Sequence, residues 1–290
     1  MKYLTGLFFK SISWLVHFSP KWFQSFLGDF IGFLWFDLLR IRRKIVLDNI
    51  KIAFPDLSYK QRVALGRKSL SVSGRNIVNY SHLPFINKEN FKEYVEIENI
   101  HHIQEALSKG KGVCLLTLHL GNGDLGGVGL SLSELPVHLI SKEFKLKWLN
   151  DLWFGVRSRL GVGFIPPRNS SYAILKKLKA NEVVIFVLDQ FMGPPIGVKT
   201  LFFGKETGTA MGLTVMAKRT GAPVIPVYCH ERADGKQVVS CESEIEFEEK
   251  GEKSETLTYM TQKYTDKLES IIKLYPEQWM WVHRRWKKFS

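Results

Sequence analysis

Residues 111–124, KGVCLLTLHLGNGD, decide the fold of this chain. The stretch opens with a short apolar run, residues 113–118, and then breaks into a glycine-rich turn that begins with His119. A short continuous apolar run beside glycine is typical of a strand buried on both faces, although a buried helical segment can look the same. We predict a strand that ends next to His119, at the position where open α/β sheets bind their ligands.

The turn after this strand offers an acid–base pair. On one continuous α-helix the side chains of His119 and Asp124 would point about 140° apart, so they can meet only if the chain turns between them. Gly121 and Gly123 permit that turn, because glycine accepts backbone angles that other residues avoid. A carboxylate facing an imidazole fixes its tautomer and stabilises the imidazolium, which suits a general base. The alternative is a histidine bound by backbone groups, with Asp124 as a helix cap.

The composition is that of a globular protein with an unusual charge. Its 290 residues are 45% hydrophobic and 24% charged, which allows a sizeable core in one large domain or two small ones. The formal net charge of +13 predicts an anionic partner: nucleic acid, anionic lipid or an acidic carrier protein. We find no RNA-recognition motif, and we therefore expect no nucleic-acid partner.

The cysteines are Cys114, Cys229 and Cys241, which lie far apart in the sequence and form no metal-binding spacing. Cys114 and Cys229 lie in apolar runs, so we expect buried thiols. A sparse, odd number of cysteines favours a reducing compartment over a disulfide framework. We expect no bound metal.

The amino-terminal region, residues 1–44, predicts membrane association. Residues 3–18 and 22–39 are largely apolar, but both are somewhat short for a hydrocarbon core of about 30 Å, and each carries a charge that is costly there. We predict two helices that lie in or dip into one leaflet. A single tilted span and a pair of helices packed on a soluble core are the alternatives. The basic cluster at residues 40–44 favours the cytoplasmic side, beside anionic headgroups.

Residues 45–290 alternate short apolar runs with helical stretches, which predicts an α/β fold with a mixed, largely parallel central sheet flanked by helices. The carboxyl ends of parallel strands share one edge of a sheet, so we expect the polar residues that follow the apolar runs to gather near His119. These residues are Lys142 after 137–140, Arg168 after 163–167, and Asp189 and Gln190 after 182–188.

Three later segments carry further expectations. Residues 209–219 predict a helix whose amino end, residues 207–209, could hold an anion. The LFFG turn at residues 201–204 could close over an apolar chain or simply plug the core. The closing segment, residues 276–288, interleaves three tryptophans with four cations, which is typical of a helix packed by its tryptophans or of a nucleic-acid tail.

Seven segments in order along the chain resemble the lysophospholipid acyltransferase superfamily, and more narrowly the bacterial lipid A biosynthesis late (lauroyl and myristoyl) acyltransferases. HLGNGD is similar to the H-x-x-x-x-[DE] motif of that superfamily. The family commonly has Trp-Glu where this chain has Gly123-Asp124, a difference that bears on the acceptor. The resemblance rests on NIKIAFP (49–55), KGVCLLTLHLGNGD, Arg168 before ILKKLK, Asp189-Gln190, LFFG (201–204), GAPVIPVY and PEQWMWVHRRWK.

The resemblance implies a glycerolipid acyltransferase-like fold, with membrane-associating helices at residues 1–44 and an acyltransferase domain at residues 45–290. It implies that His119 is the general base and Asp124 its partner, with no metal and no cofactor. The substrate-binding residues that it implies are Asn122, Arg168, Asp189 and Gln190; Lys142 joins them by position alone.

The implied activity is transfer of a fatty acyl group from a thioester, on acyl carrier protein or coenzyme A, to a hydroxyl of a lipid A precursor. The implied location is the cytoplasmic face of the cell inner membrane, on an anionic surface. One alternative is a different acceptor: a lysophospholipid, an aminolipid or a glycolipid. The other is a non-catalytic lipid-binding protein on the same scaffold.

Overall fold

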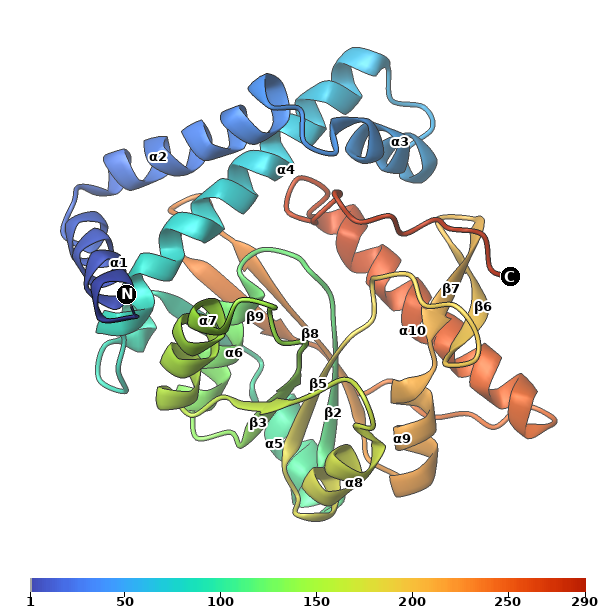
Figure 1. Cartoon of the computed structure of the whole chain (residues 1–290). Coiled ribbons are helices and arrows are strands. Elements are labelled where there is room, and N and C mark those ends of the chain that lie inside the picture. The colour runs from blue at the N-terminus through green and yellow to red at the C-terminus, as the bar shows by residue number, and fades with distance from the viewer. Residues whose placement is uncertain (1) are drawn as a thin grey trace.

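The computed structural model describes residues 2–290 and shows a central sheet with helices on both faces (Figure 1). Within these residues the sheet has seven strands in the order β1-β9-β8-β2-β5-β3-β4, and β6 and β7 form a separate antiparallel hairpin. The predicted mixed and largely parallel sheet is confirmed, since β8, β2, β5, β3 and β4 run parallel. The strands are β1 Val95–Glu98, β2 Val113–Thr117, β3 Val137–Ile140, β4 Gly163–Ile165, β5 Val183–Val187, β6 Gly197–Phe202, β7 Lys205–Ala210, β8 Val224–Glu231 and β9 Gln237–Cys241.

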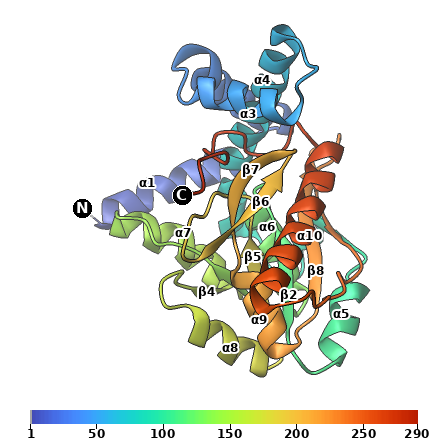
Figure 2. The ribbon, with the colours of Figure 1, turned by 90° about the vertical axis from the view of Figure 1, so that its right-hand side faces the viewer.

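The helices cover both faces of this sheet and extend beyond it at the amino terminus (Figure 2). The α-helices are α1 Lys2–His17, α2 Lys21–Phe33, α3 Arg43–Ala53, α4 Tyr59–Asn79, α5 His101–Ser108, α6 Gly123–Leu132, α7 Lys147–Arg159, α8 Ser171–Lys179, α9 Gly212–Thr220 and α10 Lys253–Leu274. Short helical turns are η1 Leu34–Leu38, η2 Tyr80–Phe85 and η3 Phe91–Glu93.

Strand β2 is buried on both faces, as its apolar run predicts. Leu116 belongs to a core cluster that also contains Leu213 of α9 and Leu268 of α10. Leu115, one residue earlier, belongs to the opposite cluster with Leu125 of α6. Successive residues of a strand point to opposite faces, so a continuous apolar run is what a strand between two helical layers needs.

Strand register brings the predicted polar residues to one edge. Thr117 at the end of β2 pairs with Val187 at the end of β5, so His119 and Asp189 each follow two residues beyond a paired position. Strands β3 and β4 end side by side, with Ile140 paired to Ile165. The carboxyl ends of four parallel strands therefore form one platform, and the site lies on it.

The amino-terminal helix α2 packs directly on α4. A Cβ atom on Gly74 would collide with the backbone of Gly28, so glycine permits this close crossing. Asp29 of α2 forms an ion pair with Arg75, and Asp37 forms one with Arg67 at 2.8 Å. The acidic groups of this region thus face protein partners. No helix within residues 2–290 has the length and apolarity needed to cross a bilayer.

Two expectations from the sequence are wrong. Residues 207–209 lie in strand β7 rather than at the amino end of a helix, and α9 begins only at Gly212. The Thr207 hydroxyl is buried and donates to the Arg285 carbonyl, so it is not available to an anion. The closing segment after α10 is irregular rather than helical, and its first residues cross the carboxyl edge, where Trp279 bridges Leu120.

Phe202 is fully buried, so the LFFG turn plugs the core.

Candidate active site

His119 stands where β2 gives way to the glycine turn, and its ring is tied to Asp189. His119 Nδ1 lies 2.8 Å from Asp189 Oδ1, and the His119 backbone N–H donates to Asp189 Oδ2 at 3.0 Å. An ionised carboxylate can only accept, so Nδ1 carries the proton and Nε2 has a free lone pair. About a third (33%) of the His119 side chain is exposed, so Nε2 can reach a substrate.

Asp189 is a buried carboxylate with a full set of donors. Its side chain is 1% exposed, and Trp279 Nε1 donates to its Oδ2 at 2.7 Å. Burial opposes ionisation, but the hydrogen bonds and charge of His119, with the Trp279 indole, outweigh it and hold the pKa of Asp189 well below its usual range. The anion in turn acts on His119. Burial lowers the pKa of that imidazole, and Asp189 more than offsets it, so the net pKa of His119 is raised.

Asp124 has different partners from those that the sequence predicts. Its carboxylate accepts from the Tyr80 hydroxyl and pairs with the buried guanidinium of Arg157. The predicted contact between His119 and Asp124 is therefore not the one that the structure forms, because Asp189 on the neighbouring strand occupies the Nδ1 side of the ring. Asp124 lies in the first turn of α6, where a negative charge is favoured by the helix dipole.

Asn122 is a structural cap at this turn. It is buried, and its side-chain oxygen accepts from the Leu125 backbone N–H at 3.1 Å, which makes it the N-cap of α6. The neighbouring backbone N–H groups of Gly121 and Asn122 donate to Gln278 and Gln237. The next N–H groups, those of Gly123 and Asp124, belong to the first helical turn, which has no intrahelical acceptor for them. They are the candidate oxyanion donors.

The other predicted residues lie on the same edge at different depths. Gln190 is exposed, and its amide nitrogen lies 3.3 Å from His119 Nε2. Lys142 and Arg168 are exposed beyond the ends of β3 and β4, which lie two and three strands from the strand that precedes His119. The structure thus joins Gln190 to His119 directly and leaves the two cations at the rim. Within residues 2–290, no group of three or more His, Cys, Asp or Glu is arranged to hold a metal ion.

Four residues at this edge were missed from the sequence: Tyr80, Arg157, Trp279 and His283. Arg157 offered a signal, since it lies one helical turn after Trp153 in α7; its guanidinium lies 4.8 Å from the Trp153 ring centroid and 5.3 Å from that of Phe164 in β4. Trp279 and His283 belong to the closing segment, which is irregular, so no periodicity in the sequence predicts its path. Their contacts depend on where α10 ends in the fold.

A histidine bound to a buried aspartate at the carboxyl edge of a largely parallel sheet has the chemistry to withdraw a proton from a hydroxyl. The chain belongs to the bacterial lipid A biosynthesis acyltransferase family, whose sequence pattern matches residues 2–288. It is 26% identical over 279 residues to the lipid A biosynthesis lauroyltransferase of Escherichia coli K12, covering 95% of this chain and 89% of that protein.

Two further relatives are named for a different acyl group or a different acceptor. The lipid A biosynthesis palmitoleoyltransferase of Escherichia coli K12 is 24% identical, over 99% of this chain and 92% of its own length. The phosphatidylinositol mannoside acyltransferase of Mycolicibacterium smegmatis is 26% identical, over 76% of this chain and 71% of its own. The family that the sequence motifs resemble is thereby confirmed, and the protein is an acyltransferase that acts on a lipid.

Proposed function

We propose that this enzyme transfers a fatty acyl group from an acyl thioester to a hydroxyl of a lipid A precursor, at the cytoplasmic face of the inner membrane. The observation that carries the proposal is the hydrogen bond between His119 Nδ1 and the buried carboxylate of Asp189, which makes Nε2 of the neutral ring the proton acceptor. This is the arrangement of a general base whose protonated form is stabilised in advance.

The reaction follows from this geometry. His119 Nε2 removes the acceptor hydroxyl proton while the hydroxyl oxygen forms a bond to the thioester carbonyl carbon. The carbonyl oxygen becomes an oxyanion, which the N–H groups of Gly123 and Asp124 can stabilise. When the tetrahedral intermediate collapses, the carbon–sulfur bond breaks and the leaving sulfur takes the proton from His119. Asp189 stabilises the imidazolium between the two proton transfers.

In the proposed reaction, Asp124 helps to stabilise the oxyanion through the first turn of α6 and does not act on the His119 imidazole. Arg157 and Tyr80 hold its carboxylate at the start of α6. We propose that this anchoring fixes the helix turn whose N–H groups stabilise the oxyanion. Arg157 is 2% exposed, and its Nη2 has no hydrogen-bond partner among the described residues. We assign Asp124 to the catalytic machinery through this turn.

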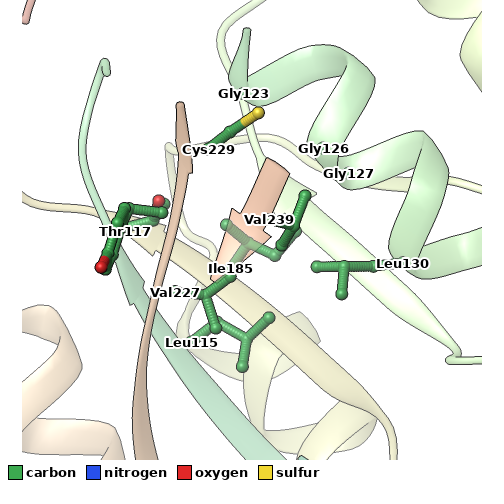
Figure 3. A pocket seen from close by; sticks show the side chains of 11 residues that line it. Leu115, Thr117, Gly123, Gly126, Gly127, Leu130, Ile185, Val227, Cys229 and Val239 are labelled. Carbon is green, nitrogen blue, oxygen red and sulfur yellow. The ribbon is translucent and has the colours of Figure 1, made fainter. Parts of the chain in front are cut away.

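The proposed place of the acyl chain is the apolar space under α6, beside the end of β2. Leu115 and Thr117 are alternate residues of β2 on the face of the sheet under α6. A cavity of about 30 Å³ lies there, lined by Leu115 and Thr117 of β2 and by Gly123, Gly127 and other residues of α6 (Figure 3). A Cβ atom on Gly127 would meet nothing within 4 Å. The cavity has room for about one water molecule, so we propose that the acyl chain packs along this glycine-lined side of α6 by widening it.

The donor's carrier is acyl carrier protein or coenzyme A, and both present a phosphorylated pantetheine arm. The acceptor proposed above is itself a phosphorylated lipid. Lys142 and Arg168, exposed at the rim of the site, would bind these phosphates. The net charge of +13 favours approach of such anionic partners.

The proposed membrane contact is the outer face of α1 and α2. Its large apolar side chains are exposed, while Asp29 and Asp37 are neutralised by ion pairs with Arg75 and Arg67. Aromatic side chains of this kind suit the interface between headgroups and acyl chains. The exposed residues of this face include Trp14, Leu15, Phe18, Trp22, Phe26 and Phe30.

The test is transfer from labelled lauroyl-acyl carrier protein, and separately lauroyl-coenzyme A, to a total lipid extract, with His119→Ala alongside. We expect a labelled, ester-linked lipid A precursor that is absent with the variant. A labelled lysophospholipid, aminolipid or glycolipid instead would replace the acceptor; the mycobacterial relative, named for phosphatidylinositol mannoside, makes the glycolipid worth including. Binding to lipid with no product from either donor would favour a non-catalytic scaffold.

A further inference from the structure

One contact of His119, that with Gln190, has no role in the proton transfers of the proposed reaction. The side-chain nitrogen of Gln190 lies 3.3 Å from Nε2 of His119 and 3.2 Å from Nε2 of His283. Nε2 of His119 is the atom that has to take the acceptor proton. An amide of the protein therefore lies at the position that the acceptor hydroxyl needs.

The hydrogen-bond roles follow from the tautomers. His119 donates from Nδ1 to Asp189, so its Nε2 accepts. An amide nitrogen carries two N–H groups, and Gln190 can donate one to each of two neutral imidazoles. Burial, the neighbouring His119 and Arg42 lower the pKa of His283, and Asp189 opposes them without reversing the shift. Nε2 of a neutral His283 can therefore accept a hydrogen bond from the Gln190 amide.

The closing segment fixes the positions of His283 and Gln190 relative to each other. The His283 backbone carbonyl accepts from the Asn49 side-chain amide at 2.7 Å. Arg285, two residues further on and fully buried, donates to the Gln190 backbone carbonyl at 3.2 Å. The ring centroids of His119 and His283 are 5.2 Å apart, a gap that the Gln190 amide bridges. Both ends of this bridge are therefore fixed by the same segment.

We infer that Gln190 and His283 are positioning residues for the acceptor hydroxyl. Gln190 caps Nε2 of His119 until the acceptor arrives, and then keeps its hydrogen bond to His283. Its other N–H, freed from His119, donates to the hydroxyl oxygen and directs the hydroxyl proton at Nε2. The inference rests on the proposed function, because it assumes a hydroxyl acceptor at this histidine.

A double-mutant cycle tests this coupling. Purified full-length enzyme is assayed with a lauroyl thioester and detergent-dispersed lipid A precursor, as wild type, Gln190→Leu, His283→Leu and the double variant. We expect each single change to lower kcat/KM for the acceptor about tenfold, as for loss of one hydrogen bond in a site. The KM for the thioester should not change, and the double variant should be no worse than the poorer single one, because the two residues act as one unit.

Two further variants separate positioning from folding. His283→Gln keeps an acceptor near Gln190 and should recover most of the activity that His283→Leu loses. Gln190→Glu places a carboxylate beside Nε2, stabilises the imidazolium and should move the acid limb of the kcat/KM profile to higher pH. Gln190 is exposed, so both of its variants should keep the wild-type thermal unfolding.

Losses that simply add in the double variant, or a Gln190→Glu profile identical to the wild type, would overturn the inference. If His283→Leu unfolds, the Gln190→Glu profile and the Gln190→Leu kinetics decide the matter. A wild-type enzyme that makes no acylated lipid would instead remove the proposed function, whereas an active wild type with additive losses removes only the role of this residue pair.

Discussion

The Trp279 indole N–H and the His119 backbone N–H donate to the same oxygen of Asp189, at 2.7 and 3.0 Å. The other Asp189 oxygen faces His119 Nδ1. A residue 160 positions further along the chain than the histidine thus completes the surroundings of its carboxylate. Met280, the next residue, donates its backbone N–H to the His119 carbonyl at 3.0 Å. The closing segment is therefore part of the site.

Trp279→Phe should lower kcat about tenfold, because a donor to the buried Asp189 is lost while the ring volume is largely kept. Loss of that bond should also lower the free energy of unfolding by about 1–3 kcal/mol. Steady-state kinetics and urea unfolding measure the two effects. Trp286→Phe is the matched control, since its indole donates to the Phe202 carbonyl and not to the site. Equal losses of kcat in both variants would contradict the assignment.

Asp189→Asn should lower kcat by about 10²–10⁴ with little change in the KM values, because a neutral amide no longer stabilises the imidazolium. The pKa of His119, which Asp189 raises, should fall. The base works only when it is neutral, so the acid limb of the remaining activity should move to lower pH. The pH dependence of kcat/KM checks this shift, and an acid limb that stays in place would exclude Asp189 as the partner of the base.

Asp124→Asn should affect the enzyme differently from Asp189→Asn, because the Asp189 carboxylate still binds His119. Breaking a buried pair leaves Arg157 uncompensated, which should cost about 3–5 kcal/mol in the free energy of unfolding. Adding Arg157→Met removes the unpaired charge and should restore most of that stability without restoring activity. Denaturant unfolding of the single and double variants measures the recovery. If stability fails to recover, the pair is not what holds the start of α6.

Gly127→Leu should shift the acyl preference toward shorter chains by filling the space beside the glycines of α6. The added Cβ meets nothing, and leucine favours a helix over glycine by about 1 kcal/mol, so the fold should be kept or slightly stabilised. Competition among acyl thioesters of graded length gives the preference. Gly212→Leu on α9, where a Cβ also has open space, should leave the preference unchanged. An unchanged profile in Gly127→Leu would place the acyl chain elsewhere.

His82 should make the attachment of α1 sensitive to acid. It lies 2.9 Å from His17 Nδ1 and 3.0 Å from the Gln24 side-chain oxygen. Burial, then His17 and Lys21, lower its pKa from 6.5 to about 4. The unfolded chain takes up this proton at higher pH than the folded chain does, so stability should fall by about 2–3 kcal/mol as pH drops from 6.5 to 4.

Urea unfolding across that pH interval measures the loss. His82→Gln should flatten the dependence, while His101→Gln, at an exposed position, should keep the wild-type slope. A slope that survives in His82→Gln would assign the acid sensitivity to other groups.

The sequence was enough for the parallel strands of the sheet and for the polar residues that directly follow them. The apolar runs before His119 and Asp189 match β2 and β5 to within a residue, because a strand buried on both faces has to be continuously apolar. The same pattern failed at residues 207–209, where threonines and glycine of β7 imitate the start of a helix. A hairpin with polar residues on one side offers no such run.

What the sequence determined by itself is the chemistry available: a histidine after the central strand, carboxylates near it and a basic surface. Which carboxylate meets the histidine was decided only by the tertiary structure. Asp124 is five positions away, yet α6 begins between them and turns it toward Arg157 and Tyr80. Asp189 is 70 positions away, yet β2 and β5 lie side by side and end in register. Hydrogen bonds between strands fix that register, and no local spacing encodes it.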